Sequence, residues 1–170
     1  MTAPALAQSD ICTACGMCCD GTLFARVLAK PDEVEALRQT GFTLTPFGTE
    51  LGFSQPCVQL CGTRCGVYAA RPQVCRTYTC PTLDAVADGT IGADEAMRRV
   101  VAVRTATDNL KAEFLPGENV QQARLRFHKA VNADEGAAVT PKFKLLLGVV
   151  EVLLDRHFRH PGQRAFGAMS

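Results

Sequence analysis

The sequence lacks the features that nucleic-acid binding requires. It contains no tryptophan and two tyrosines, and its 18 Lys and Arg residues are nearly balanced by 17 Asp and Glu residues. A surface that follows a phosphate backbone needs a clear excess of basic residues, and base stacking needs exposed aromatic rings. We therefore expect no nucleic-acid partner.

Hydrophobic runs long enough to cross a membrane are also missing. The longest apolar stretch, residues 145–154, is interrupted by Glu151, whereas a membrane-spanning helix needs about 20 consecutive apolar residues. The N-terminal residues MTAPALAQSDI contain neither a basic segment nor an apolar run of signal-peptide length. The sequence thus predicts a cytoplasmic protein that does not associate with membranes.

Several enzyme motifs are absent as well. The chain has no P-loop, no dinucleotide-binding glycine motif, no HExxH and no nucleophile elbow. Low-complexity segments are missing too, and 47% of the residues are hydrophobic, so a chain of this length can bury a core. The sequence predicts a folded protein but leaves its status as an enzyme open.

The most informative feature that is present is a set of nine cysteines, all within the first 80 residues. An odd number would leave a thiol unpaired in a secreted protein, and thiols stay reduced in the cytoplasm. Clustered cysteines in that compartment indicate metal binding or redox chemistry rather than disulfides.

The first cysteine run is Cys12-x2-Cys15-x2-Cys18-Cys19. Its opening C-x2-C-x2-C spacing matches the start of the bacterial ferredoxin signature, and Gly16 permits close approach of the backbone to a bulky cluster. Cys19 follows directly where ferredoxins continue with x3-C-P. The run indicates a metal ion or an iron–sulfur cluster.

The second run extends from residue 57 to residue 80. It reads Cys57-x3-Cys61-x3-Cys65, followed by Cys75-x4-Cys80-Pro81. Together the two runs supply eight thiolates or more, which allows one four-thiolate site with spare cysteines or two sites.

These motifs, together with Cys65-Gly-Val-Tyr and Arg71-Pro-x2-Cys75-Arg-x-Tyr-x-Cys80, closely resemble the CxxCxxCC cysteine-cluster family, also called the YkgJ family. The resemblance spans about residues 10–81 and implies a zinc- or iron-chelating domain. It also implies a set of metal ligands: Cys12, Cys15, Cys18, Cys19, Cys57, Cys65, Cys75 and Cys80. Cys61 is an additional cysteine outside the family pattern. Related domains occur in flagellin lysine methylases.

Positive side chains near the cysteines would offset the negative charge of such a site. Four thiolates around Zn²⁺ or a [4Fe–4S]²⁺ core leave a net charge of about −2, which arginines offset. Arg64, Arg71 and Arg76 lie in this region, and Arg76 is the first candidate because it adjoins Cys75. His157 and His160 lie near the end of a predicted helix, where the helix dipole favours positive charge. We expect this role for them rather than metal binding.

The fold class that we expect is mainly helical α+β. A small, turn-rich cysteine-cluster lobe (residues 1–85) would pack against about three C-terminal helices (residues 86–170), the two together forming one compact domain. The lobe would contain a strand over residues 21–29 and a helix over residues 30–41 that ends at Gly41.

The C-terminal helices are predicted from apolar spacing and from caps. Val100 and Val101 fall on the apolar face of the first helix, residues 94–114, and Val131 on that of the second, residues 120–131. A third helix runs over residues 141–158.

Function follows from the cysteines. Our first hypothesis is an iron–sulfur cluster, of the 4Fe-4S type, in a redox or accessory role with a protein partner, because every predicted ligand is a cysteine. The second is a zinc-binding structural or protein-interaction module. Part of a methylase-related enzyme, or metal delivery by soft thiolates, is a further alternative.

Overall fold

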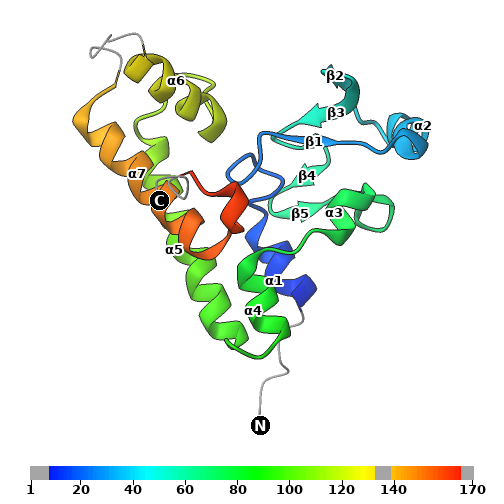
Figure 1. Cartoon of the computed structure of the whole chain (residues 1–170), viewed down its shortest axis with the longest axis horizontal. Coiled ribbons are helices and arrows are strands. Elements are labelled where there is room, and N and C mark those ends of the chain that lie inside the picture. The colour runs from blue at the N-terminus through cyan, green and yellow to red at the C-terminus, as the bar shows by residue number, and fades with distance from the viewer. Residues whose placement is uncertain (1–7, 133–138, 166–170) are drawn as a thin grey trace. The chain divides into compact units, whose positions relative to one another are not determined.

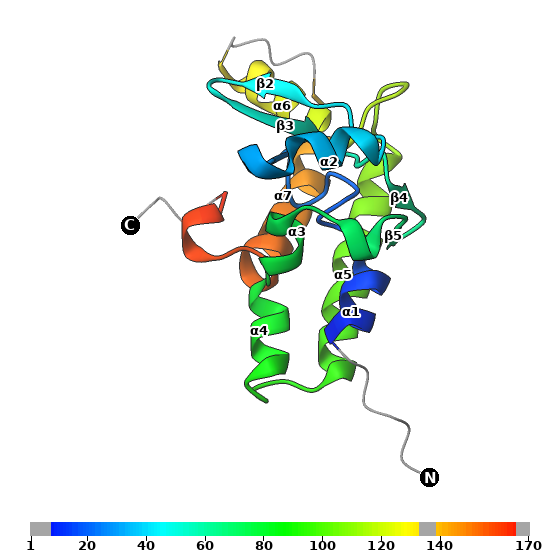
Figure 2. The ribbon, with the colours of Figure 1, turned by 90° about the vertical axis from the view of Figure 1, so that its right-hand side faces the viewer.

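The computed structural model describes residues 8–132 and 139–165 (Figures 1 and 2). In these residues the fold is mainly helical with two small antiparallel sheets, so the predicted α+β class is confirmed. Backbone contacts divide the described chain into two compact units, and the division falls between Thr79 and Cys80. We call residues 8–79 the cysteine unit and residues 80–165 the helical unit.

The first helix of the cysteine unit is positioned by a glycine. Helix α1 (Gln8–Cys15) ends at Gly16, whose φ of +66° lies in the left-handed region. A Cβ atom at Gly16 would lie 3.1 Å from Cα of Thr63, in the turn between β4 (Leu60–Cys61) and β5 (Arg64–Cys65). Because glycine has no side chain, the first cysteine run can approach this hairpin closely.

Three short strands form the larger sheet, in the order β1-β3-β2. Strand β3 (Glu50–Ser54) pairs antiparallel with β1 (Arg26–Leu28) and with β2 (Thr45–Phe47). Gly52 of β3 has no room for a side chain, since a Cβ atom there would collide with the carbonyl oxygen of Val27. Of the predicted strand over residues 21–29, only residues 26–28 form a strand, and residues 21–23 form bends instead.

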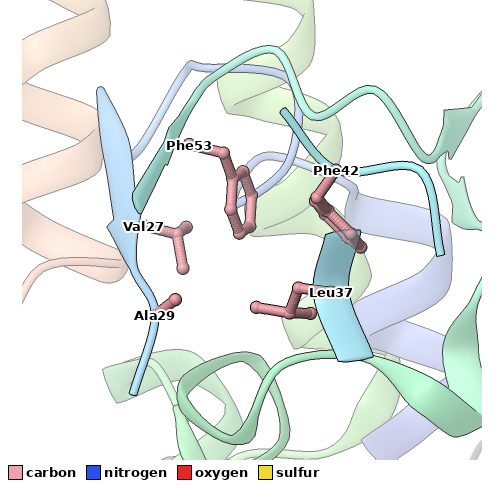
Figure 3. Close-up of a cluster of buried hydrophobic side chains, with 5 residues drawn as sticks. All are labelled: Val27, Ala29, Leu37, Phe42 and Phe53. Carbon is pink, nitrogen blue, oxygen red and sulfur yellow. The ribbon is translucent and has the colours of Figure 1, made fainter. Parts of the chain in front are cut away.

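The sheet and the following helix enclose a small core. A 3-10 turn (Pro31–Glu33) leads into α2 (Val34–Gln39), and the chain leaves the helix through Gly41 at a φ of +86°, as predicted. Figure 3 shows the buried side chains of this core, which are Val27, Ala29, Leu37, Phe42 and Phe53. Cys57 and Cys75 are among the partly buried residues that pack against it. The core thus supports two of the predicted metal ligands.

Two short helical segments complete the cysteine unit. The 3-10 turn η2 (Tyr68–Ala70) is followed by α3 (Gln73–Thr77), which carries Cys75. Pro72 is the N-cap residue of α3, one position before the first helical residue, Gln73.

Four α-helices are described in the helical unit. They are α4 (Pro81–Ala87), α5 (Ala93–Lys111), α6 (Val120–Asn132) and α7 (Pro141–His157). The last three correspond to the three predicted C-terminal helices. Helix α4 was not predicted, although Pro81 lies in its first turn, a position that proline favours.

Helices α5 and α7 lie side by side and supply most of this unit's buried residues (Figure 1). Small side chains such as Ala96 and Ala106 face inward on α5, which allows close helix packing. The predicted apolar faces were wrong in part: Val101 and Val131 are 57% and 58% exposed. None of the helices among the described residues is long and apolar enough to cross a membrane.

A buried ion-pair network links α6, α7 and the segment that follows α7. Glu151 accepts hydrogen bonds from Arg124 and from Arg159, each at 2.7 Å, and Arg159 also donates to Asp155 at 2.8 Å. Glu151 and Arg159 are both buried. The acidic residue that interrupts the longest apolar stretch is therefore a fully paired core residue.

Candidate metal centre

All nine cysteines lie in the part of the chain that the structure describes, and each is a thiol rather than half of a disulfide. Cys80 is buried, seven others are half-buried, and Cys61 is exposed. The fold therefore shields the eight predicted ligands from solvent, in whole or in part, and leaves only the additional cysteine, Cys61, exposed.

Four of these thiols form a mutually interacting group, which we call the thiol tetrad: Cys19, Cys57, Cys65 and Cys75. Cys19 interacts electrostatically with the other three, Cys75 with Cys57 and Cys65, and Cys57 with Cys65, which accounts for all six pairs. The tetrad therefore joins both cysteine runs, although its members lie up to 56 positions apart in the sequence (Cys19 to Cys75).

Each tetrad cysteine comes from a different local structure. Cys19 lies in the turn after α1, Cys57 in the loop before β4, Cys65 in β5 and Cys75 in α3. The backbone N–H of Cys57 donates to the carbonyl oxygen of Cys19 at 2.7 Å, which ties the two runs directly together. Gln59 reinforces this loop, because its side chain donates to the carbonyl oxygen of Thr40 at 2.6 Å.

Burial raises the pKa of three tetrad thiols, Cys19, Cys57 and Cys75, and so favours their protonated form. Burial is the main cause that raises the pKa of Cys19 to about 12, from an ordinary 9.0, and the neighbouring thiols raise it further. Burial also raises the pKa of Cys75 to about 11, and it raises the pKa of Cys57. A cation placed among the four sulfurs would favour their thiolate forms, since metal binding displaces the protons.

The helix that carries Cys75 is held by an acidic residue that the sequence analysis did not identify. Oε1 of Glu33 accepts a hydrogen bond at 2.6 Å from the backbone N–H of Gln73, the first residue of α3. Oε2 of the same carboxylate is buried without a hydrogen-bond partner among the described residues. No local sequence signal marks the contact of Glu33 with α3.

The tetrad is a group of neighbouring thiols rather than a closed coordination shell. Within residues 8–132 and 139–165, no three or more His, Cys, Asp or Glu side chains have the arrangement that holds an ion. The donor set nevertheless fits a metal, because four cysteine sulfurs are the ligands of all-cysteine zinc sites and of iron–sulfur clusters.

One family profile matches residues 11–99, a range that contains all eight predicted ligands and slightly more than half of the chain. The profile is named CxxCxxCC and is described as a putative zinc- or iron-chelating domain. The chain belongs to the CxxCxxCC family. The predicted membership is thereby confirmed, and the match extends beyond the motif region into α5. No curated protein and no solved structure matches the chain.

The four cysteines that give the CxxCxxCC family its name have different surroundings here. Cys12 lies within α1 and interacts with Cys19 of the tetrad, Cys15 is the last residue of that helix, and Cys18 lies in the turn that follows. Among the remaining predicted ligands, Cys80 is the N-cap residue of α4. The tandem ferredoxin-like spacing is thus divided between a helix and a turn.

Of the arginines in the CxxCxxCC region, Arg71 rather than Arg76 interacts with the thiols. Arg71 lowers the pKa of both Cys12 and Cys75, although burial outweighs it. Arg76 instead forms an ion pair with Glu33 at 3.6 Å, and its side chain is 50% exposed. The first candidate named from the sequence was wrong, because adjacency to Cys75 does not determine where a side chain on a helix points.

The histidines lie outside the matched residues of the CxxCxxCC domain. Nε2 of His160 is 3.8 Å from Asp84, and the ring of His157 contacts Phe158 edge to face. Tyr78 packs against Phe24 in the same manner, with ring centroids 4.9 Å apart.

Proposed function

We propose that the protein binds a metal centre through the thiol tetrad and uses it in a redox or accessory role. The observation that carries this proposal is that all six tetrad pairs interact although their residues come from four separate segments. A metal bound by these four half-buried thiols would displace their protons, and its binding energy would stabilise the folded cysteine unit.

An iron–sulfur cluster is the first candidate for the centre, and when bound it would supply one-electron chemistry. An all-sulfur donor set without a histidine supports this choice. The chain itself would contribute half-buried sulfur ligands, a hydrophobic core behind Cys57 and Cys75, and positive charge. We propose Cys12, Cys15, Cys18 and Cys80 as the further ligands that the family pattern implies.

Zinc is the second candidate, in a structural or protein-interaction module. It is favoured by the division of the tetrad among four separated segments, which suits a tetrahedral site with four cysteine ligands.

We also propose a protein partner and a cytoplasmic location. Val58 and Val74 directly follow and precede tetrad cysteines, yet they are 66% and 41% exposed. Exposed aliphatic side chains beside a metal centre suit contact with another protein. Nine reduced thiols suit a reducing compartment.

Anaerobic purification, followed by a visible absorption spectrum and by iron, zinc and acid-labile sulfide analysis, tests the proposal. A brown protein with iron and sulfide supports the cluster, whereas a colourless protein with stoichiometric zinc supports the second candidate and excludes the first. A reduced, folded protein that takes up neither metal, even after reconstitution, contradicts metal binding by the tetrad.

A further inference from the structure

Arg71 has an unusual environment in the cysteine unit. Its Nε atom is buried and has no hydrogen-bond partner in the described part of the chain. The guanidinium carbon lies over the Tyr68 ring, 3.8 Å from its centre, so the two side chains form a cation–π contact. Tyr68 and Arg71 are joined by the 3-10 turn η2, which brings residues three positions apart onto one side of the chain.

A buried N–H group without an acceptor costs free energy, and native proteins rarely keep one without a reason. The contact with the Tyr68 ring restricts the movement of the guanidinium and so helps to hold its donors in place. An acceptor that forms only in the metal-bound protein would satisfy the orphan donor. Thiolate sulfur is such an acceptor, because it becomes anionic when a metal displaces its proton.

Arg71 interacts with thiols from both cysteine runs. Arg71 interacts electrostatically with Cys75 of the tetrad and with Cys12, which in turn interacts with Cys19. Arg76 differs, because the Glu33 carboxylate already pairs with it. Arg71 therefore combines a buried, unpartnered donor with proximity to the sulfurs.

We propose that Arg71 is a positioning residue of the metal centre, held by Tyr68, whose Nε–H donates to a thiolate of the loaded tetrad and whose charge offsets the anionic sulfurs. This inference rests on the proposed function of the tetrad. Arg71 supplies no metal ligand, so its loss should weaken metal binding without changing the number of sulfur ligands. Residues in this position typically change metal affinity by about 10- to 100-fold.

Cobalt(II) titration of the full, reduced chain under anaerobic conditions tests the role. Thiolate-to-cobalt charge transfer and the visible d–d bands report how many sulfurs bind, and competition with a chelator gives the affinity. The variants are Arg71→Met, Arg71→Lys and Tyr68→Leu. Arg76→Met is the matched control, since it removes a positive charge beside the same cysteine.

We expect Arg71→Met to lose about tenfold or more in Co²⁺ affinity while the spectrum of four bound thiolates is retained. Arg71→Lys and Tyr68→Leu should lose less, because the first keeps the charge and the second keeps the arginine. Arg76→Met should bind Co²⁺ as the unsubstituted chain does. If Arg71→Met fails to fold by circular dichroism, the same comparison is made with the other two variants.

Affinities of the Arg71 and Tyr68 variants equal to those of Arg76→Met would overturn the positioning role and leave the proposed function intact. Loss of sulfur ligands from the Arg71→Lys spectrum would also overturn it, because the residue would then be needed to assemble the site. Absence of any thiolate–cobalt absorption in the unsubstituted chain would instead contradict the proposed function itself.

Discussion

The Cys19 thiol is half-buried, and four other thiols lie close enough to raise its pKa. Cys61 has the opposite environment, since it is exposed at the end of β4 and lies outside the tetrad. The two residues have the same chemistry but different surroundings. They therefore form a matched pair for testing which sulfurs hold metal.

We expect Cys19→Ser to abolish or strongly reduce stoichiometric metal binding and to lower the melting temperature of the loaded protein, because metal-binding energy is also folding energy. Cys61→Ser should keep its metal and its melting temperature. Metal analysis and thermal unfolding of the purified variants provide the measurement. Equal metal content in both variants would contradict the assignment of the tetrad.

At the scale of the secondary-structure elements, the contact between α1 and the β4–β5 hairpin depends on Gly16. Gly48 has the same φ of +66°, but a Cβ atom there would meet nothing within 4 Å. An alanine in the left-handed conformation costs about 1–2 kcal/mol of stability at either position. Only at Gly16 would its Cβ atom also come too close to Thr63.

We therefore expect Gly16→Ala to lower the free energy of unfolding by more than Gly48→Ala does, and to weaken metal binding, because Cys12 and Cys19 flank the displaced turn. Urea unfolding and chelator competition measure the two effects. Equal destabilisation by the two variants would show that the approach of the hairpin to Gly16 contributes nothing.

The elements of the helical unit are joined by the buried network around Glu151. Glu151→Gln would leave Arg124 and Arg159 without a full counter-charge, and breaking a buried pair costs about 3–5 kcal/mol. Glu95→Gln on α5 is the control, because its partners Arg98 and Arg99 lie on the same helix and Glu95 itself is not buried. Urea unfolding should show a large loss for the first variant and little change for the second.

For the whole molecule, the thiol pKa values predict how stability depends on pH when no metal is bound. The folded-state pKa of Cys19 and Cys75, about 12 and about 11, lies above the ordinary 9.0. A raised pKa means that the folded state binds the proton more tightly, so this stability is fully present below about pH 9 and is lost as the pH rises towards 12.

We expect the metal-free, reduced chain to lose stability between pH 9 and pH 12, and Cys19→Ser to lose less over the same range. Chemical unfolding at a series of pH values measures this difference. Identical pH profiles for the two proteins would mean that Cys19 does not titrate in the environment described.

Removal of metal should affect the two units differently. The helical unit has its own apolar core in α5 and α7, whereas the cysteine unit has a small core with two tetrad cysteines packed against it. Chelation is therefore expected to increase amide hydrogen exchange in residues 8–79 more than in α5 and α7. Equal increases in both units would show that they unfold as one cooperative body.

Much of this protein could be predicted from local pattern. The three long helices follow from apolar spacing and from Pro141 and Thr140 at a helix start, where the Thr140 side chain accepts a hydrogen bond from the N–H of Phe143. Gly41 ends its helix as expected, and the cysteine spacings identify the family. These features depend on residues close in sequence, whose interactions the sequence itself specifies.

The remaining features depend on residues that are distant in sequence. Val101 and Val131 were predicted to lie on buried faces, but both are more than half exposed, whereas Ala96 and Ala106 are buried on α5. The same limit applies to the pairing of Glu33 with α3 and to the choice of Arg71 over Arg76. Helical spacing gives the period of a buried face, but the partner element determines which residues lie on it.

The sequence by itself determined that sulfur ligands are concentrated in the first half of the chain and that helices dominate the second, because spacing and composition are local properties. Only the tertiary structure decided that Cys19 joins Cys57, Cys65 and Cys75. It also decided that Arg71 keeps a buried donor, unpartnered among the described residues, near these thiols. The physical reason is that burial and electrostatic interaction depend on distances in space, which are set when Gly16 and the hairpin bring separate segments together.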